Sequence, residues 1–211
     1  LQGRPAGGPA VGPVGGGRED AVVTLTRGGV LSAHDRSGKQ LFTYNMGSGF
    51  ITGPSLGDVD GDGALEIVTI DVQGAVRAVE GRSRREKWMF RSEAGTTMGR
   101  VALADVNGDG GMDALFTTLS GLLTVIDGKS GTLFARRNIR DFSFSTPLAA
   151  DLNGDGKLEV VTAGRGGAIG VVQVGTTRRT LVSFRKSSWS SVNRNAMNTG
   201  YSRFSLLDRG R

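Results

Sequence analysis

The segment Gly-Asp-Val-Asp-Gly-Asp-Gly-Ala-Leu-Glu, residues 57–66, is the stretch of sequence that decides the fold. Close copies of it occupy residues 104–113 and 150–159, so that the first aspartates of the three copies, Asp58, Asp105 and Asp151, lie 47 and 46 residues apart. Each copy is followed by two short apolar runs with a glycine turn between them. Short β-rich runs and turn signals that repeat at this period predict a tandem array of antiparallel strands.

A fourth, damaged copy of the unit begins near residue 8. Residues 8–16 align with residues 53–61, and the strand-like runs that follow are retained. Pro13 and Gly15 stand where the first two acids are expected, and of the acids only Asp20 remains. We therefore expect this unit to keep its strands and to lack the acidic loop.

A four-stranded unit of about 45 residues in tandem is typical of β-propeller blades. We predict an all-β β-propeller with about four blades in this chain, which either close a small ring or belong to a larger ring of seven or eight. A β-sandwich or β-solenoid is the alternative, but three loops that match at nearly every position argue against accidental similarity. The expected units are residues 1–7, a linker or the end of a preceding strand; 8–52, the damaged repeat; 53–99, 100–145 and 146–188, three calcium repeats; and 189–211, a tail or closing strand.

The acidic loops have the form Asp-x-Asp/Asn-x-Asp-Gly-x-x-Asp/Glu, which predicts a metal site. Oxygen-bearing side chains at positions 1, 3, 5 and 9 and the backbone carbonyl of position 7 can converge on one ion, and hard oxygen ligands suit Ca²⁺. An EF-hand needs a Glu at position 12, where this chain has Thr69, Phe116 and Thr162. We expect about three Ca²⁺ ions. The predicted ligands are Asp58, Asp60, Asp62, Ala64 and Glu66; Asp105, Asn107, Asp109, Gly111 and Asp113; and Asp151, Asn153, Asp155, Lys157 and Glu159.

These nine-residue loops resemble the calcium-binding repeats of FG-GAP proteins, which are related to the integrin α-subunit propeller. The turn that starts at Asp127 and the tail from Trp189 to Gly200 are similar to parts of quinoprotein-like propellers. The resemblance implies a propeller whose calcium ions make its hairpins rigid, often as a ligand-binding or adhesion module. Extracellular modules bind Ca²⁺ at roughly 10⁻⁴–10⁻³ M. We therefore expect the chain outside the cell, at the cell surface or in the lumen of the secretory pathway.

The charges are divided unevenly along the chain, which has 26 Lys and Arg against 20 Asp and Glu. Half of the acids lie in the three loops, so the remaining surface is strongly basic. One basic cluster contains Lys87 and two of the arginines below, and an acidic glycan or protein is the predicted partner. The alternative is a solvated outer edge that protects exposed strands from pairing. The candidate residues are Arg84, Arg85, Arg136, Arg137, Arg178 and Arg179.

Other partners and activities find less support in the sequence. Nucleic acid is not expected, because no aromatic residues alternate with the basic ones. Membrane association is expected only through a segment outside this sequence. With no Cys and with His34 as the sole histidine, the usual nucleophile–base pairs are missing, and no enzyme is predicted. Two alternatives stay open: a polysaccharide lyase or glycoside hydrolase on a calcium-loaded propeller, and an assembly subunit whose blades complete a ring with further blades of the same or another chain.

Overall fold

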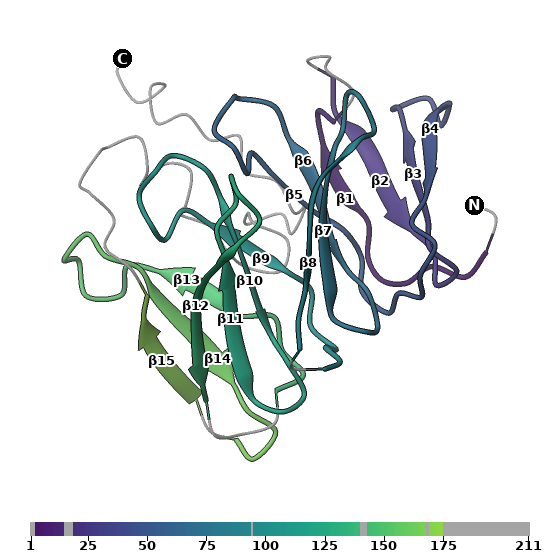
Figure 1. The fold of residues 1–211 in the computed structure, drawn as a ribbon. Coiled ribbons are helices and arrows are strands. Elements are labelled where there is room, and N and C mark those ends of the chain that lie inside the picture. The colour runs from purple at the N-terminus through teal and green to yellow at the C-terminus, as the bar shows by residue number, and fades with distance from the viewer. Residues whose placement is uncertain (1–2, 15–18, 94, 140–142, 168, 175–211) are drawn as a thin grey trace.

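The computed structural model describes residues 3–14, 19–93, 95–139, 143–167 and 169–174, and within these ranges the regular structure is entirely β (Figure 1). The strands form four antiparallel sheets, numbered sheet 1 to sheet 4 in chain order, each with its strands side by side in sequence order. No described residue belongs to a helix that could cross a membrane.

The sheets share similar strand lengths and spacing, and sheet 4 has three strands among the described residues. Sheet 1 holds β1 (Ala10–Gly12), β2 (Ala21–Leu25), β3 (Val30–His34) and β4 (Gln40–Asn45). Sheet 2 holds β5 (Ser55–Gly57), β6 (Glu66–Ile70), β7 (Ala75–Glu80) and β8 (Glu86–Arg91). Sheet 3 holds β9 (Ala102–Ala104), β10 (Asp113–Thr117), β11 (Leu122–Ile126) and β12 (Leu133–Asn138). Sheet 4 holds β13 (Leu148–Ala150), β14 (Glu159–Ala163) and β15 (Ile169–Gln173).

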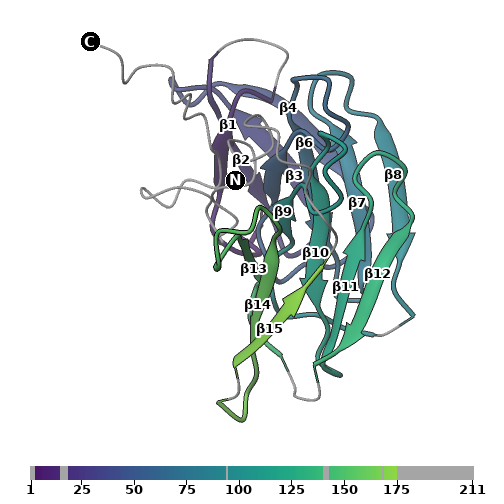
Figure 2. The same ribbon diagram turned by 90° about the vertical axis from the view of Figure 1, so that its left-hand side faces the viewer.

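The sheets are arranged like the blades of a propeller, which confirms the predicted fold class. The first strands, β1, β5, β9 and β13, contact one another in that order, and the remaining strands of each sheet extend outward (Figures 1 and 2). Each sheet lies inside one of the predicted units, and sheet 1 keeps four strands although its first loop lacks the acids. The predicted tail, residues 189–211, lies outside the described residues.

Three apolar cores join the sheets, one between each pair of neighbours. Successive side chains of a strand point to opposite faces. A middle blade has a neighbour on both faces, and every residue of its second strand, β6 or β10, is buried. These strands are apolar except for the closing acid and one threonine in each, Glu66 and Thr69 in β6 and Asp113 and Thr117 in β10. Trp88 and Phe90 of β8 pack against the core between sheets 2 and 3.

The antiparallel order places two kinds of connection at one end of every sheet, here called the metal-loop end. The loop from the first strand to the second and the turn from the third strand to the fourth both lie there, because the chain reverses direction at each step. Trp88 is at this end, and its Nε1 donates a 2.7 Å hydrogen bond to the carbonyl of Gly128 in the β11–β12 turn of sheet 3. Neighbouring blades therefore contact each other where the acidic loops lie.

The outward face of sheet 4 differs from the equivalent face of sheet 3. The β10–β11 and β14–β15 registers match, so Leu123 corresponds to Ile169 and Val125 to Val171. In sheet 3 these side chains are buried against sheet 4, whereas among the described residues nothing covers their counterparts. Leu148, Leu152, Ile169 and Val171 are 38–74% exposed, and their equivalents Ala102, Val106, Leu123 and Val125 are 0–3% exposed.

Close backbone packing where the chain enters the first strands predicts the effect of one substitution. A Cβ at Gly53 would overlap the carbonyl oxygen of Gly8 and the guanidinium of Arg100, which is itself hydrogen-bonded to that carbonyl. We expect Gly53→Ala to lower the free energy of unfolding by about 1–3 kcal/mol, measured by urea denaturation. Gly28→Ala is the matched control, because a Cβ there meets nothing within 4 Å, and its effect should stay within about 0.5 kcal/mol. Equal effects of the two changes would contradict this account.

Candidate metal centre

The three acidic loops, loop 1 (residues 58–66), loop 2 (105–113) and loop 3 (151–159), share one backbone shape. Each joins the first strand of its sheet to the second and has glycines at positions 4 and 6 with positive φ: 81° and 92° in loop 1, 76° and 90° in loop 2, and 77° and 83° in loop 3. Left-handed backbone strains other residues and is free for glycine. The paired glycines let nine residues curl tightly enough to turn backbone N–H groups inward.

The aspartate at position 1 organises each loop by accepting those N–H groups. Asp58 accepts hydrogen bonds from Gly61 at 2.7 Å and from Gly63 at 3.0 Å. Asp105 accepts from Gly108 and Gly110 at 2.7 and 3.0 Å, and Asp151 from Gly154 and Gly156 at 2.7 and 2.9 Å. The same two bonds in all three loops indicate that the sequence repeat encodes one local structure.

The acid at position 9 closes each loop from the start of the second strand. Glu66, Asp113 and Glu159 each accept the N–H of position 2, from Val59, Val106 and Leu152, and each distance is 2.9 Å. These three acids are buried, so the acid at position 9 is fixed at the base of the loop. In all three loops the carboxylate at position 9 is therefore held in the same place by the backbone of position 2.

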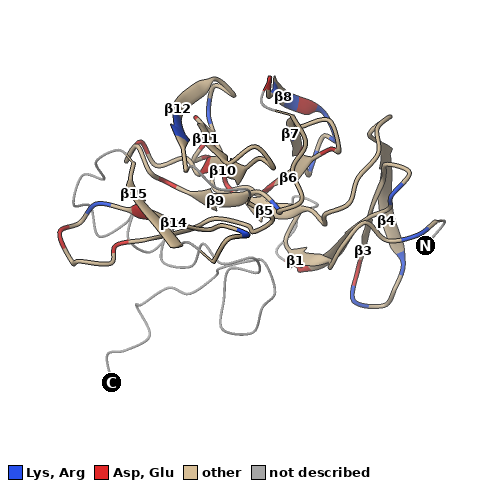
Figure 3. Cartoon of the chain, turned by 90° about the horizontal axis from the view of Figure 1, so that it is seen from below, with Lys and Arg blue, Asp and Glu red and all other residues tan. Residues whose placement is uncertain are grey.

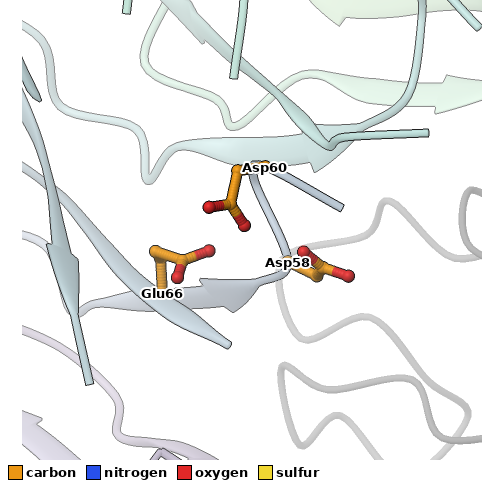
Figure 4. Close-up of side chains that lie close together, drawn as sticks. All are labelled: Asp58, Asp60 and Glu66. Carbon is orange, nitrogen blue, oxygen red and sulfur yellow. The ribbon is translucent and has the colours of Figure 1, made fainter. Parts of the chain in front are cut away.

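Loop 1 brings three carboxylates together closely enough to bind a metal ion. One oxygen each from Asp58, Asp60 and Glu66 lies within 4.8 Å of the others, and Figure 4 shows Asp60 and Glu66 facing one another. Oxygen ligands placed 2.3–2.6 Å from an ion can be separated by up to roughly 5 Å, so this spacing fits one shared ion. Asp62 is exposed and accepts the N–H of Ala64 at 2.7 Å. Asp62, the predicted ligand at position 5, thus lies on the exposed side of the loop, and Ala64 at position 7 is half-buried.

The acids of loop 1 have shifted pKa values. Burial raises the pKa of Glu66 to about 7, against the opposing effects of the Val59 N–H and of Lys87. Burial also acts to raise the pKa of Asp60, but the hydrogen bond and the charge of Lys87 outweigh it and lower that pKa. A buried carboxylate that takes up a proton near neutral pH lacks a sufficient cationic partner, which a metal ion would supply.

Loop 2 is more deeply buried than loop 1, and it makes hydrogen bonds to the β11–β12 turn of its own sheet. Its closing acid Asp113 accepts hydrogen bonds from Gly128 N at 3.0 Å and from the Asn107 side chain at 3.3 Å, and burial raises its pKa to about 7. Burial also raises the pKa of Asp105. Asp109 accepts the N–H of Gly111 at 2.8 Å and lies 3.5 Å from Lys129. Asn at position 3 leaves two acids, rather than three, on the inner side of this loop.

Loop 3 is the most open of the three. Asp151 and Lys157 are half-buried, and Asn153 and Asp155 are exposed. The side chains at positions 3 and 5 accept N–H groups within the loop, from Asp155 and Lys157 at 2.9 and 2.8 Å. Of the described residues, only loop 1 groups three carboxylates around a common point, and it therefore offers the best-formed candidate centre.

Loops 1 and 2 touch each other across the blade interface. The N–H of Met112 donates a 2.9 Å hydrogen bond to the carbonyl of Asp58. A Cβ on Gly61 would stand 3.1 Å from the carbonyl oxygen of Gly110, so the two loops are packed backbone to backbone. Loops 1 and 2 are therefore in direct contact with each other.

The basic candidates occupy two different positions in their sheets. Arg84 and Arg85 lie in the β7–β8 turn at the metal-loop end, where Arg84 has a positive φ of 61°. Arg136 and Arg137 lie within β12, opposite Thr124 and Leu123 of β11. Figure 3 shows basic residues on the outer strands β8 and β12. Arg178 and Arg179 lie outside the described residues.

The sequence did not identify two residues that contact the acidic loops, Lys87 and Asp127. Lys87, taken as part of a basic surface cluster, contacts Asp60 and Glu66. Asp127 accepts a 2.9 Å hydrogen bond from the Asn107 side chain of loop 2. The strand order holds the signal that could have found them, because it brings the turn before each fourth strand to the same end as the acidic loop.

Comparisons with known proteins support the propeller and the repeat. Residues 58–116, from the first residue of loop 1 into β10, match the family model of the FG-GAP-like repeat, which confirms the resemblance seen in the sequence. No curated protein matches the chain.

Several solved structures share the fold. BamB from Moraxella catarrhalis is 17% identical with a TM-score of 0.55, and the match covers 84% of this chain and 52% of BamB. The V. cholerae biofilm matrix protein Bap1 is 23% identical with a TM-score of 0.57, over 77% of this chain and 30% of Bap1. The computationally designed Ika4 protein is 15% identical with a TM-score of 0.58, over 83% of this chain and 94% of Ika4. This chain therefore spans about half of the BamB chain and under a third of the Bap1 chain.

The raised pKa values of Glu66 and Asp113 predict an unusual pH dependence for the metal-depleted protein. The unfolded chain releases these protons near the ordinary pKa values of 4.5 and 3.8, whereas the folded chain keeps them until about 7. Between these values the folded state binds more protons, so its stability falls as the pH rises. We expect a lower free energy of unfolding at about pH 7.5 than at about pH 5, measured by urea denaturation. Glu66→Gln should reduce the difference, and a stability that rises over this range would contradict the assignment.

Proposed function

We propose that this chain is a calcium-stabilised β-propeller that acts as a binding, adhesion or structural module outside the cytosol. The observation that carries the proposal is the loop structure repeated in three successive sheets, with an aspartate at position 1 clamped by two glycine N–H groups and a buried acid at position 9. Hairpin loops with this density of oxygen donors are costly to fold without a cation, because their buried carboxylates lose hydration.

Calcium is the ion that the donor set fits best. All the side-chain donors are carboxylate or amide oxygens, and the carbonyls of Ala64, Gly111 and Lys157 stand at position 7 of the three loops. Ca²⁺ accepts 6–8 such oxygens in flexible geometry, whereas Mg²⁺ demands a near-ideal octahedron. We propose one ion per loop, three in all. When bound, the ion supplies positive charge to the buried acids, and the loop residues hold the hairpin ends of adjacent blades in place.

An extracellular, cell-surface or luminal location follows from the same proposal. Loops of this kind in extracellular modules bind calcium at roughly 10⁻⁴–10⁻³ M, a concentration met outside the cytosol. The V. cholerae neighbour is a biofilm matrix protein, so the fold has at least one extracellular use. The proposed partner is a protein or an acidic glycan bound by exposed arginines such as Arg84, Arg85 and Arg137. A polysaccharide lyase or hydrolase on this scaffold stays a prediction that no described residue tests.

The calcium proposal is tested by melting the protein with and without the ion. Calcium at about one hundred times the dissociation constant adds about 2.7 kcal/mol per site, so Tm should rise by several degrees over that in EDTA. Asp58→Asn, Asp105→Asn and Asp151→Asn should each reduce the calcium-dependent rise. Asp35→Asn is the matched control, because Asp35 accepts the N–H groups of Ser37 and Lys39 in a similar tight turn outside the loops. An identical Tm in calcium and in EDTA would refute the proposal.

A second candidate function, assembly into a larger ring, is favoured by the uncovered face of sheet 4. This face continues the interface that already joins each sheet to the next. The outward face of sheet 1 carries the complementary half, since the pairs Val22–His34 and Thr24–Ser32 match Ile67–Val79 and Thr69–Arg77 of sheet 2 in register. We propose a second copy of this chain as the occupant, because two copies would match both faces in an eight-bladed ring, within the usual range of propellers.

The assembly proposal predicts a dimer by light scattering at micromolar concentration. Ile169→Glu with Val171→Glu should convert the dimer to a monomer, because both side chains would be buried against the second copy. Leu133→Glu is the control, since Leu133 is 45% exposed on the outermost strand of sheet 3. A monomer at all concentrations would overturn the proposal and assign the cover of sheet 4 to residues 175–211 or to another protein.

A further inference from the structure

The lysine at the edge of loop 1 occupies a position that a metal ion would compete for. Lys87 is the second residue of β8, and its ammonium contacts Oδ2 of Asp60 and lies 3.3 Å from Oε1 of Glu66. These acids are positions 3 and 9 of loop 1 and two members of the carboxylate triad. The Lys87 side chain is 25% exposed and that of Glu66 is 0% exposed. The protein thus places one of its own cations against the candidate centre.

Loops 2 and 3 have neutral donors at the equivalent point. The second oxygen of Asp113 accepts from Gly128 N and the Asn107 amide, and that of Glu159 lies 3.4 Å from the Gln173 amide. Lys129 contacts loop 2 only at Asp109, and its side chain is 40% exposed. Of the three described loops, only loop 1 has a lysine in contact with the acid at position 9.

The charge count of the loops explains where the lysine occurs. Loop 1 has Asp60 at position 3, whereas loops 2 and 3 have Asn107 and Asn153. Loop 1 therefore carries four carboxylates, and the other two carry three. Lys87 offsets the additional negative charge, so loop 1 with its lysine has the net charge of a loop with three acids.

We propose that Lys87 is a resident cation of loop 1, which holds Asp60 and Glu66 together when metal is scarce and competes with the divalent ion for them. The proposal rests on the calcium function above and adds its regulation at one loop. An ammonium on a flexible four-carbon stem can withdraw to solvent when an ion arrives. Until it does, repulsion between the two cations weakens metal binding. Loop 1 should therefore fill at higher calcium concentration than without Lys87 and should stay ordered with less dependence on the ion.

Trp88 gives a readout local to this lysine. It follows Lys87 in β8 and is one of two tryptophans in the chain, the other being Trp189. In a Trp189→Phe background, Trp88 fluorescence during titration with calcium chloride reports on loop 1 and its strand. Lys87→Met keeps most of the aliphatic stem and removes the charge. We expect the calcium midpoint of Lys87→Met to fall about tenfold, and its Tm in metal-depleted buffer to drop below that of the parent.

Two variants serve as controls for charge and for contact. Arg82→Met removes an equal charge from the same turn, where Arg82 is exposed, and should leave the midpoint within about twofold of the parent. Lys87→Arg keeps the charge and should keep the weak midpoint.

The outcomes separate this proposal from the one on which it rests. If the Lys87→Met protein unfolds without metal and refolds when calcium is added, the resident-cation proposal is strongly supported. Calcium binding with an unchanged or weaker midpoint in Lys87→Met overturns the resident-cation proposal alone, as does a variant that stays unfolded in calcium while Lys87→Arg folds. Absence of any calcium response in the parent and in both lysine variants, by fluorescence and by calorimetry, overturns the calcium function itself.

Discussion

Burial of both faces of a blade is the constraint on which the rest of this structure depends. A sheet whose second strand is buried at every position and is mainly apolar after its first residue, as in β6 and β10, loses hydrophobic stabilisation when one face is exposed to water. It needs a neighbour on each side, and the tandem repeat supplies one. The radial order of the sheets, the close approach of the first strands and the contact between successive acidic loops all follow from stacking identical units in one direction. The acidic loops are thus placed next to one another by apolar packing between the blades.

Much of this arrangement could be predicted from the sequence, because it is local and repeated. The period of 46 or 47 residues identified the blade, and the fixed spacing of the acids in the three copies identified the acidic loop. The same spacing argument placed strands in the damaged first unit, where the structure has four. Such features depend on residues near one another in the chain or on repetition of the same pattern.

The features that could not be predicted depend on contacts between side chains that are far apart in the sequence and meet only in the folded chain. Nothing in the spacing of Lys87 and Asp60, 27 residues apart, shows that they meet. The three similar loop motifs predicted three similar sites, but the first aspartate is buried in loop 2 (Asp105) and half-buried in loop 3 (Asp151). Of the three described loops, only loop 1 brings three carboxylates together. The cause is position in the array. Loops 1 and 2 are packed against each other, while loop 3 lies on the last described sheet.

The contact between the Asp58 carbonyl and the Met112 N–H has a consequence for how the array behaves as a whole. In a stack of repeats, the free energy of unfolding is approximately the sum of the intrinsic stability of each repeat and the stability added by each interface between neighbours. Sheets 2 and 3 each have two junctions, made by apolar cores, by Trp88 and by this hydrogen bond, whereas sheets 1 and 4 have one among the described residues. In a single copy of the four described sheets, we therefore expect thermal fraying to start at the two end sheets and to move inward. The central pair of blades would then be the last cooperative unit to open, and the best-formed candidate metal centre lies within it.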